Sequence, residues 1–204
     1  MTKTTAALSR LLLACASALV LWSLVATAAL AAPAPRTAPG DPLDPRTYAP
    51  NSRLFLAVHA IGVQKYACQA NGTWLFTDPE AALYRPTGAP ERPFPSRTRR
   101  IGTHFLNFPS GRPVWQLQDG SSVEAARTAV APGGTGNVPW LLLQAVVTTA
   151  GSDGNELTGT TWVQRLNTSG GVAPAGTCTP GDRKAVAYTS DYRFWKAQAD
   201  SSDD

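Results

Sequence analysis

Short runs of apolar, aromatic and β-branched residues alternate with turn signals along the chain from residue 54 onward. Residues 54–68 (LFLAVHAIGVQKYAC) are rich in aromatic and β-branched side chains, and on a strand Gln64, Tyr66 and Cys68 would share one face. Residues 73–77 (TWLFT) follow a turn signal at Asn71 and Gly72. This pattern predicts a strand, a tight turn and a second strand.

Later segments repeat this pattern between turns that are rich in glycine and proline. They are residues 101–108, 114–118, 157–168 and 185–195. Asp119 and Gly120 stand between two apolar runs, which is the strongest short-range signal of a β-hairpin. Residues 138–149 (VPWLLLQAVVTT) are apolar on both faces. We expect them to form a central strand covered on both sides; the alternative, a buried helix, is disfavoured by their run of β-branched residues.

One helical element is expected, in residues 78–83 (DPEAAL). Asp78 would cap a helical turn, and Pro79 would occupy its first position, where the missing N–H of proline does no harm. The rest of the pattern gives seven to nine short strands. It indicates an all-β, single-domain antiparallel β-sandwich or barrel with one short helical turn, and it does not distinguish sandwich from barrel.

The N-terminal segment has the pattern of an export signal. Lys3 and Arg10 precede an uncharged stretch rich in Leu and Ala, which ends in the small-residue pattern Ala29-Leu30-Ala31. Residues 1–31 are therefore interpreted as a signal peptide, and the protein as secreted or periplasmic. The alternative is a retained membrane anchor over residues 11–32, but no positive flank follows that would stop transfer.

The remaining chain divides into three parts by composition. Residues 32–52 include six prolines and predict a disordered linker. Residues 53–196 form the expected globular domain, and residues 197–204 an acidic, disordered tail. With 43% apolar and 16% charged residues, the chain of 204 residues is too hydrophobic to be a disordered polyelectrolyte.

Charge gives little indication of a macromolecular partner. Lys3 and Arg10 leave with the signal segment, which lowers the net charge from +4 to +2 and argues against nucleic-acid binding. Residues 85–100 hold five arginines against one glutamate. They are interpreted as a solvated loop, with contact to an anionic envelope surface as the alternative.

Three cysteines occur in the chain, and Cys15 lies in the signal segment. The other two, Cys68 and Cys178, predict one disulfide, because a pair of cysteines in an exported protein is normally oxidised. Neither belongs to a Cys-x-x-Cys motif, so the sequence gives no support to a redox-exchange role.

Residues capable of metal or acid–base chemistry are few. His59 and His104 lack the spacing of a metal site, so no metal is expected. His104, Asp119 and Ser121 supply the residue types of a hydrolase. Ser121, however, follows a hairpin glycine, and Asp119 is better explained as a turn residue. We therefore assign no catalytic residue and keep these three as candidates.

Aromatic side chains are the least ordinary feature, and most of them are expected in the core. The alternative is that several line one open face or barrel mouth, where a sugar ring or a small apolar ligand could bind. The ligand-binding candidates on that interpretation are Trp74, Trp115, Trp162, Gln164 and Arg165.

An ordered series of motifs runs through residues 54–195. It comprises Gly62-x-Gln64-x-Tyr66-x-Cys68, Pro79-x-Ala81-x-Leu83, Gly102-x-His104, Trp115 with Asp119-Gly120-Ser121, Trp140 followed by three leucines, and Gln164-Arg165-x-x-Thr168-x-Gly170-Gly171. In these motifs the chain resembles an uncharacterised secreted family of bacteria and fungi, domain of unknown function 3455. The resemblance implies an exported, strand-rich protein with no assigned activity.

Some members of that family have a malate-dehydrogenase-like name. Hydride transfer with a nicotinamide requires a Gly-x-Gly-x-x-Gly turn between a strand and a helix. Residues 133–139 (GGTGNVP) lack the third glycine and lead into an apolar strand. The sequence therefore argues against a dehydrogenase, and no cofactor is expected.

We expect a non-catalytic protein that binds a small molecule or an envelope component such as a polysaccharide. A secreted hydrolase that uses His104 is one alternative. A structural or stress-related envelope protein is another.

Overall fold

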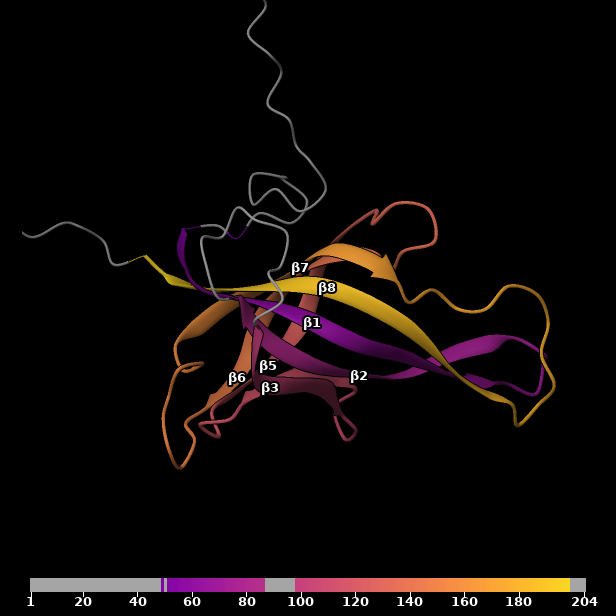
Figure 1. Ribbon diagram of the computed structural model, residues 1–204, viewed down its shortest axis with the longest axis horizontal. Helices are drawn as coiled ribbons and strands as arrows, with labels where there is room; N and C mark the ends of the chain where they lie inside the picture. The colour runs from indigo at the N-terminus through magenta and orange to yellow at the C-terminus, as the bar shows by residue number, and fades with distance from the viewer. Residues whose placement is uncertain (1–48, 50, 87–97, 199–204) are drawn as a thin grey trace, which may run out of the picture. The chain divides into compact units, whose positions relative to one another are not determined.

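The computed structural model describes residues 49, 51–86 and 98–198, and in this part of the chain every regular element is a strand (Figure 1). The strands are β1 (Ser52–Cys68), β2 (Trp74–Pro86), β3 (Thr98–Asn107), β4 (Arg112–Leu117), β5 (Ser122–Ala131), β6 (Trp140–Thr149), β7 (Thr160–Gly170) and β8 (Arg183–Ala197). The all-β prediction is confirmed.

The eight strands form a closed barrel in which each strand pairs with its neighbours in the sequence. Antiparallel pairing of β1 with β8 closes the sheet, and it extends from the Ser52–Ala197 pair to the Ala67–Arg183 pair. Figure 1 shows these two strands running side by side. Closure leaves no unpaired sheet edge. Of the two predicted architectures, the protein adopts the barrel.

Side chains on β1 alternate between the barrel interior and its surface. Gln64, Tyr66 and Cys68 are buried on one face, as the sequence predicts, whereas Lys65 points outward and pairs with Asp78 and Glu80. The hairpin predicted at Asp119 and Gly120 joins β4 to β5. Gly120 has a φ of +83°, in the left-handed region that a tight turn uses.

The predicted helical turn at residues 78–83 is wrong, because these residues belong to β2. Asp78 does not cap its own segment: its Oδ1 accepts a hydrogen bond from the N–H of Leu106 on β3 at 3.1 Å. Pro79, Ala81 and Leu83 are buried at every second position, which is the period of a strand. The cap-like Asp-Pro pair instead follows a β-bulge opposite Lys65 and Tyr66.

The apolar run at residues 138–149 is a strand, as expected, over the bounds of β6. Its first half is covered on both sides, with Trp140, Leu142 and Leu143 buried. Its second half is different, since Val146 and Val147 are 49% and 50% exposed. A closed barrel has no central strand, so double coverage here comes from packing on the barrel's outer face and extends over only half of β6.

The predicted disulfide between Cys68 and Cys178 is present, with Cα atoms 5.8 Å apart. It joins the end of β1 to the loop between β7 and β8. A disulfide of this kind is typical of proteins outside the reducing cytosol.

The predicted signal segment at residues 1–31, almost all of the predicted linker and the end of the acidic tail lie outside the described residues, as does most of the arginine-rich segment. Ala49, just before β1, is fully buried against the outer face of the barrel with Leu142 and Trp195. β1 begins at Ser52 and β8 ends at Ala197, slightly beyond the predicted domain bounds.

Candidate functional site

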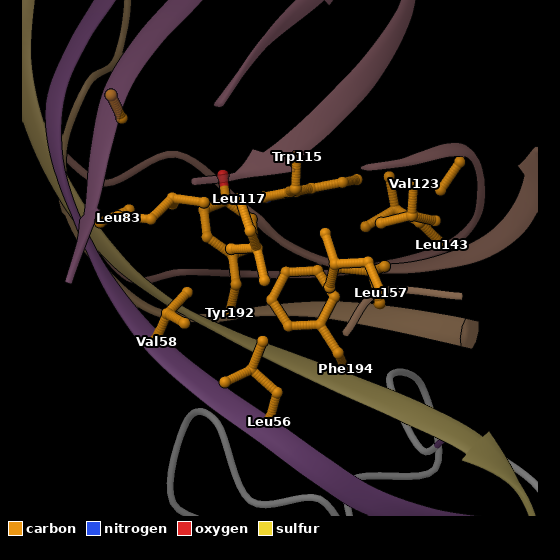
Figure 2. Close-up of a cluster of buried hydrophobic side chains, with 14 of the residues drawn as sticks. Leu56, Val58, Leu83, Trp115, Leu117, Val123, Leu143, Leu157, Tyr192 and Phe194 are labelled. Carbon is orange, nitrogen blue, oxygen red and sulfur yellow. The ribbon is translucent and has the colours of Figure 1, made fainter. Parts of the chain in front are cut away.

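One end of the barrel interior is filled with apolar side chains. Figure 2 shows the rings of Tyr192 and Phe194 below Trp115 in that view, with aliphatic side chains packed around them. Members of this cluster from all eight strands and the β6–β7 loop are Leu56, Val58, Leu83, Ile101, Leu117, Val123, Leu143, Leu157, Val163 and Phe194. Trp115 and Tyr192, each 1% exposed, form its boundary with the rest of the interior.

The other end of the interior holds a cavity of about 490 Å³. All eight strands contribute to its wall, and so do the β3–β4 loop through Gly111 and the β5–β6 loop through Val138 and Pro139. The cavity therefore opens at the end of the barrel where the odd-numbered strands finish. Its wall combines leucine and aromatic side chains with a few polar groups, as small-molecule sites commonly do.

The loop between β5 and β6 is fixed across this end of the barrel. Asn137 forms a β-bridge with Gly171, and the Thr168 hydroxyl donates to the Val138 carbonyl at 2.6 Å. The Tyr66 hydroxyl donates to the Gly171 carbonyl at 2.6 Å from the opposite side. Gly171 has a φ of +84°, and a Cβ there would collide with Gln64 and Tyr188, so only glycine fits this crossing.

Arg165 points into the cavity from β7. It pairs across the sheet with Tyr192, whose ring faces the interior, and cross-strand partners share a face. Its Nε and Nη2 both donate to the Pro139 carbonyl, at 3.0 and 2.8 Å. Arg165 thus holds the β5–β6 loop and places a positive charge inside the barrel.

His104 also lines the cavity, and its side chain is only 3% exposed. Its ring stacks on the ring of Trp115, with the centroids 4.7 Å apart and an angle of 10° between the planes. The Nδ1 atom is 2.8 Å from the Val114 carbonyl oxygen, which can only accept, so Nδ1 carries the proton. Burial, assisted by the nearby Arg165 charge and opposed by the bond to Val114, lowers the pKa of His104 to about 3. The ring is therefore neutral at physiological pH.

The charge of Arg165 also reaches two tyrosines. Burial raises the pKa of Tyr66, and Arg165 offsets part of that rise. Burial also raises the pKa of Tyr188 well above its ordinary value, assisted by Tyr192 and opposed by Arg165. Both tyrosines stay protonated at physiological pH, so they present hydroxyl groups and no negative charge.

Several buried polar atoms around the cavity have few or no hydrogen-bond partners among the described residues. The clearest is the indole nitrogen of Trp115; the side-chain nitrogen of Gln64 and the hydroxyl groups of Tyr188 and Tyr192 have only one another as partners there. Leaving a buried donor without a partner costs about 1–3 kcal/mol. Groups of this kind complete their bonding with an ordered water or with a ligand.

The structure brings together only some of the ligand-binding candidates. Trp115 and Arg165 line the cavity. Gln164 points outward, where its Oε1 accepts a hydrogen bond from the Trp195 indole at 2.8 Å, and Trp162 packs with Trp195 on the same outer face. Trp74 is half-buried at the start of β2 opposite Cys68 and does not line the cavity.

Asp119 and Ser121 lie at the other end of the barrel from the cavity, in the β4–β5 hairpin. The Ser121 hydroxyl donates to Asp119 at 2.6 Å and accepts from the N–H of Leu157, so it supports the closed end. Burial alone would raise the pKa of Asp119, but hydrogen bonds from Ser121 and the Glu156 N–H outweigh burial and lower it. Neither residue hydrogen bonds to His104 in the described part of the chain.

Most cavity residues were not among the ligand-binding candidates, and the polar or aromatic ones include Gln64, Tyr66, His104 and Tyr192. The sequence carried a signal for two of them, because Gln64 and Tyr66 share one face of a predicted strand. Nothing in the sequence alone indicates which face of a strand points into an open part of the interior and which into a filled one.

In the described ranges, no group of His, Cys, Asp and Glu side chains could hold a metal ion. A search of the same ranges for helices long and apolar enough to cross a membrane finds none.

A family model described as "Protein of unknown function (DUF3455)" matches residues 49–196. The match covers all eight strands, from just before β1 to the last residue but one of β8. No curated protein and no solved structure gives a significant match to the chain.

Proposed function

The chain belongs to the DUF3455 family, and because that membership assigns no activity, we propose from the cavity that the exported protein binds a small molecule inside its barrel without transforming it. The observation that carries the proposal is the cavity of about 490 Å³ with wall residues from every strand. Small-molecule sites typically enclose about 300–1,000 Å³. Eight-stranded barrels are wide enough to be filled by side chains or to hold one small ligand.

The division of the interior supports binding. Filling the whole barrel with apolar side chains would be more stable, yet the described wall keeps Gln64, His104 and Arg165 facing the cavity. Polar groups on an otherwise apolar concave wall fix the orientation of a ligand. The fixed β5–β6 loop keeps this wall in shape before a ligand arrives, which lowers the entropic cost of binding.

The environment of His104 argues against the hydrolase alternative. A general base works best when its pKa lies near the working pH, and the pKa of His104 is lowered to about 3. Its Nδ1 is bonded to a backbone carbonyl and not to a carboxylate that would orient it. Ser121 is committed to bonds at the closed end.

Export is the second part of the proposal. Residues 1–31 have the charge pattern and the small-residue ending of a signal peptide. The Cys68–Cys178 disulfide supports the same localisation, secreted or periplasmic.

The test uses phenylnaphthylamine, an uncharged aromatic probe that fluoresces strongly in apolar surroundings, with protein exported from cells that express the full chain. We expect saturable binding of one probe per chain. Leu141→Trp places an indole in the cavity from a residue that is only partly buried, and it should weaken binding about tenfold or more. Val147→Trp is the matched control, on the same strand but outward and half exposed, and should leave binding unchanged.

Cooperative thermal melts of both variants establish that they are folded. The proposal is refuted if the two tryptophan variants bind the probe equally, or if the wild-type protein binds neither this probe nor the charged analogue used below.

A further inference from the structure

Positive charge on the cavity wall is not balanced within the described residues. Three arginines line the cavity, Arg112, Arg127 and Arg165, and none of the described lining residues is Asp or Glu. Arg112 pairs with Glu124 at 3.3 Å. In the described ranges Arg127 and Arg165 form no ion pair.

Arg165 retains donors after it has fixed the loop. A guanidinium has five N–H donors, and the Pro139 carbonyl occupies one on Nε and one on Nη2. The residue is half-buried opposite Tyr192, and its bonds to Pro139 lie on the exposed side of the guanidinium group. Here a charge interacts more strongly than it would in water, as its effects on His104, Tyr66 and Tyr188 indicate. A second contact to Arg165 would therefore be a strong one.

The hydrogen-bonding groups around the cavity are unequally distributed between donors and acceptors. Trp115 Nε1 is a donor without a partner among the described residues, and Gln64 Nε2 and the Tyr192 hydroxyl have no partner there besides the Tyr188 hydroxyl. The neighbouring carbonyls of Val114, Pro139 and Gly171 already accept hydrogen bonds from side chains of the wall. The unprotonated Nε2 of His104 is an acceptor on the same wall, but donors outnumber it, and they favour a ligand that presents acceptors.

We infer that the barrel binds an amphipathic organic anion, whose carboxylate or similar acid group pairs with Arg165 while its apolar body contacts Leu141, Leu143 and the aromatic wall. The inference rests on the proposed function, since it names the chemical class of the molecule that the cavity takes. Arg127, exposed at the cavity, adds positive charge that attracts the same class of molecule.

Two matched probes test this inference. Anilinonaphthalenesulfonate has the ring system of phenylnaphthylamine plus one sulfonate, so the pair differs in the acid group alone. Arg165→Gln removes the charge and keeps an N–H donor for the Pro139 carbonyl. We expect it to weaken binding of the sulfonate probe about tenfold or more, since bonds to charged groups are the strong ones, and to change binding of the uncharged probe by less than about twofold.

Two further variants separate charge at this site from charge in general. Arg165→Lys keeps the positive charge and should recover part of the lost affinity for the sulfonate probe. Arg53→Gln removes the same unit of charge from an exposed position at the start of β1, away from the cavity, and should weaken neither probe. Thermal melts of all variants establish that the binding measurements refer to folded protein.

The two proposals fail in different ways. If the wild-type protein binds phenylnaphthylamine but not the sulfonate probe, the anion inference is overturned and the proposed function stands. If Arg165→Gln weakens both probes equally, or neither, Arg165 only holds the β5–β6 loop and the inference is likewise overturned. If the wild-type protein binds neither probe, the proposed function itself fails.

Discussion

The buried imidazole of His104 makes a quantitative prediction about acid stability. In the unfolded chain its pKa returns to the ordinary value of 6.5, whereas burial in the barrel lowers it to about 3. Between these values the unfolded state binds more protons than the folded state, so the free energy of unfolding falls as the pH is lowered. A pH of about 5 lies roughly 1.5 units below the ordinary pKa, and each unit lowers the free energy of unfolding by about 1.4 kcal/mol. The free energy of unfolding at about pH 5 is therefore about 2 kcal/mol lower than at neutral pH.

Urea denaturation at a series of pH values between about 8 and 5 measures this loss, because carboxylates with ordinary pKa values contribute little in that range. His104→Asn is the matched variant. It keeps an N–H donor near the Val114 carbonyl but does not titrate, so we expect a lower stability at neutral pH and a pH dependence about 2 kcal/mol smaller. His59 is common to both proteins and cancels in the comparison. Equal losses in the two proteins would refute the assignment of His104 as a buried, neutral histidine.

Two further predictions concern the clamp and the filled end of the barrel. Replacing Cys68 and Cys178 together by Ser should lower the free energy of unfolding by about 2–5 kcal/mol, since the bridge closes a loop of 110 residues. Urea denaturation measures this loss of stability, and an unchanged urea midpoint would contradict the prediction. Leu157→Ala should lower the free energy of unfolding by about 2–5 kcal/mol, because Leu157 is fully buried. Val147→Ala, at a half-exposed position, should lower it by less than about 0.5 kcal/mol. Similar thermal midpoints for these two variants would contradict the packing described for the filled end.

Local pattern was enough to predict most strands, because a strand's period of two follows from backbone geometry alone. It failed where a local signal had two interpretations. The Asp78-Pro79 pair resembles a helix cap, yet Asp78 bonds to β3 and β1, which are remote in sequence from one another. The distinction between barrel and sandwich also lay beyond the pattern, since it depends on the pairing of β1 with β8.

The grouping of Trp162, Gln164 and Arg165 in one cleft shows why the site was only partly predicted. Side chains two positions apart on a strand share a face, and adjacent ones do not. Trp162 and Gln164 therefore face outward together, while Arg165 faces the cavity. The period of two was sufficient to separate Arg165 from the other two. Only the closed barrel determines which of the two faces lines a cavity.

The two ends of the barrel are stabilised by different means, and this difference connects stability to binding. The filled end is held by apolar burial, whereas the cavity end has less apolar packing and keeps donors without partners. The disulfide, the bridge between Asn137 and Gly171, and the bonds from Arg165 to Pro139 all lie at the cavity end. They replace the packing that a cavity removes and hold its wall in a fixed geometry. A preformed wall loses less entropy when a ligand binds, so under the proposed function the clamp at this end contributes to binding as well as to folding.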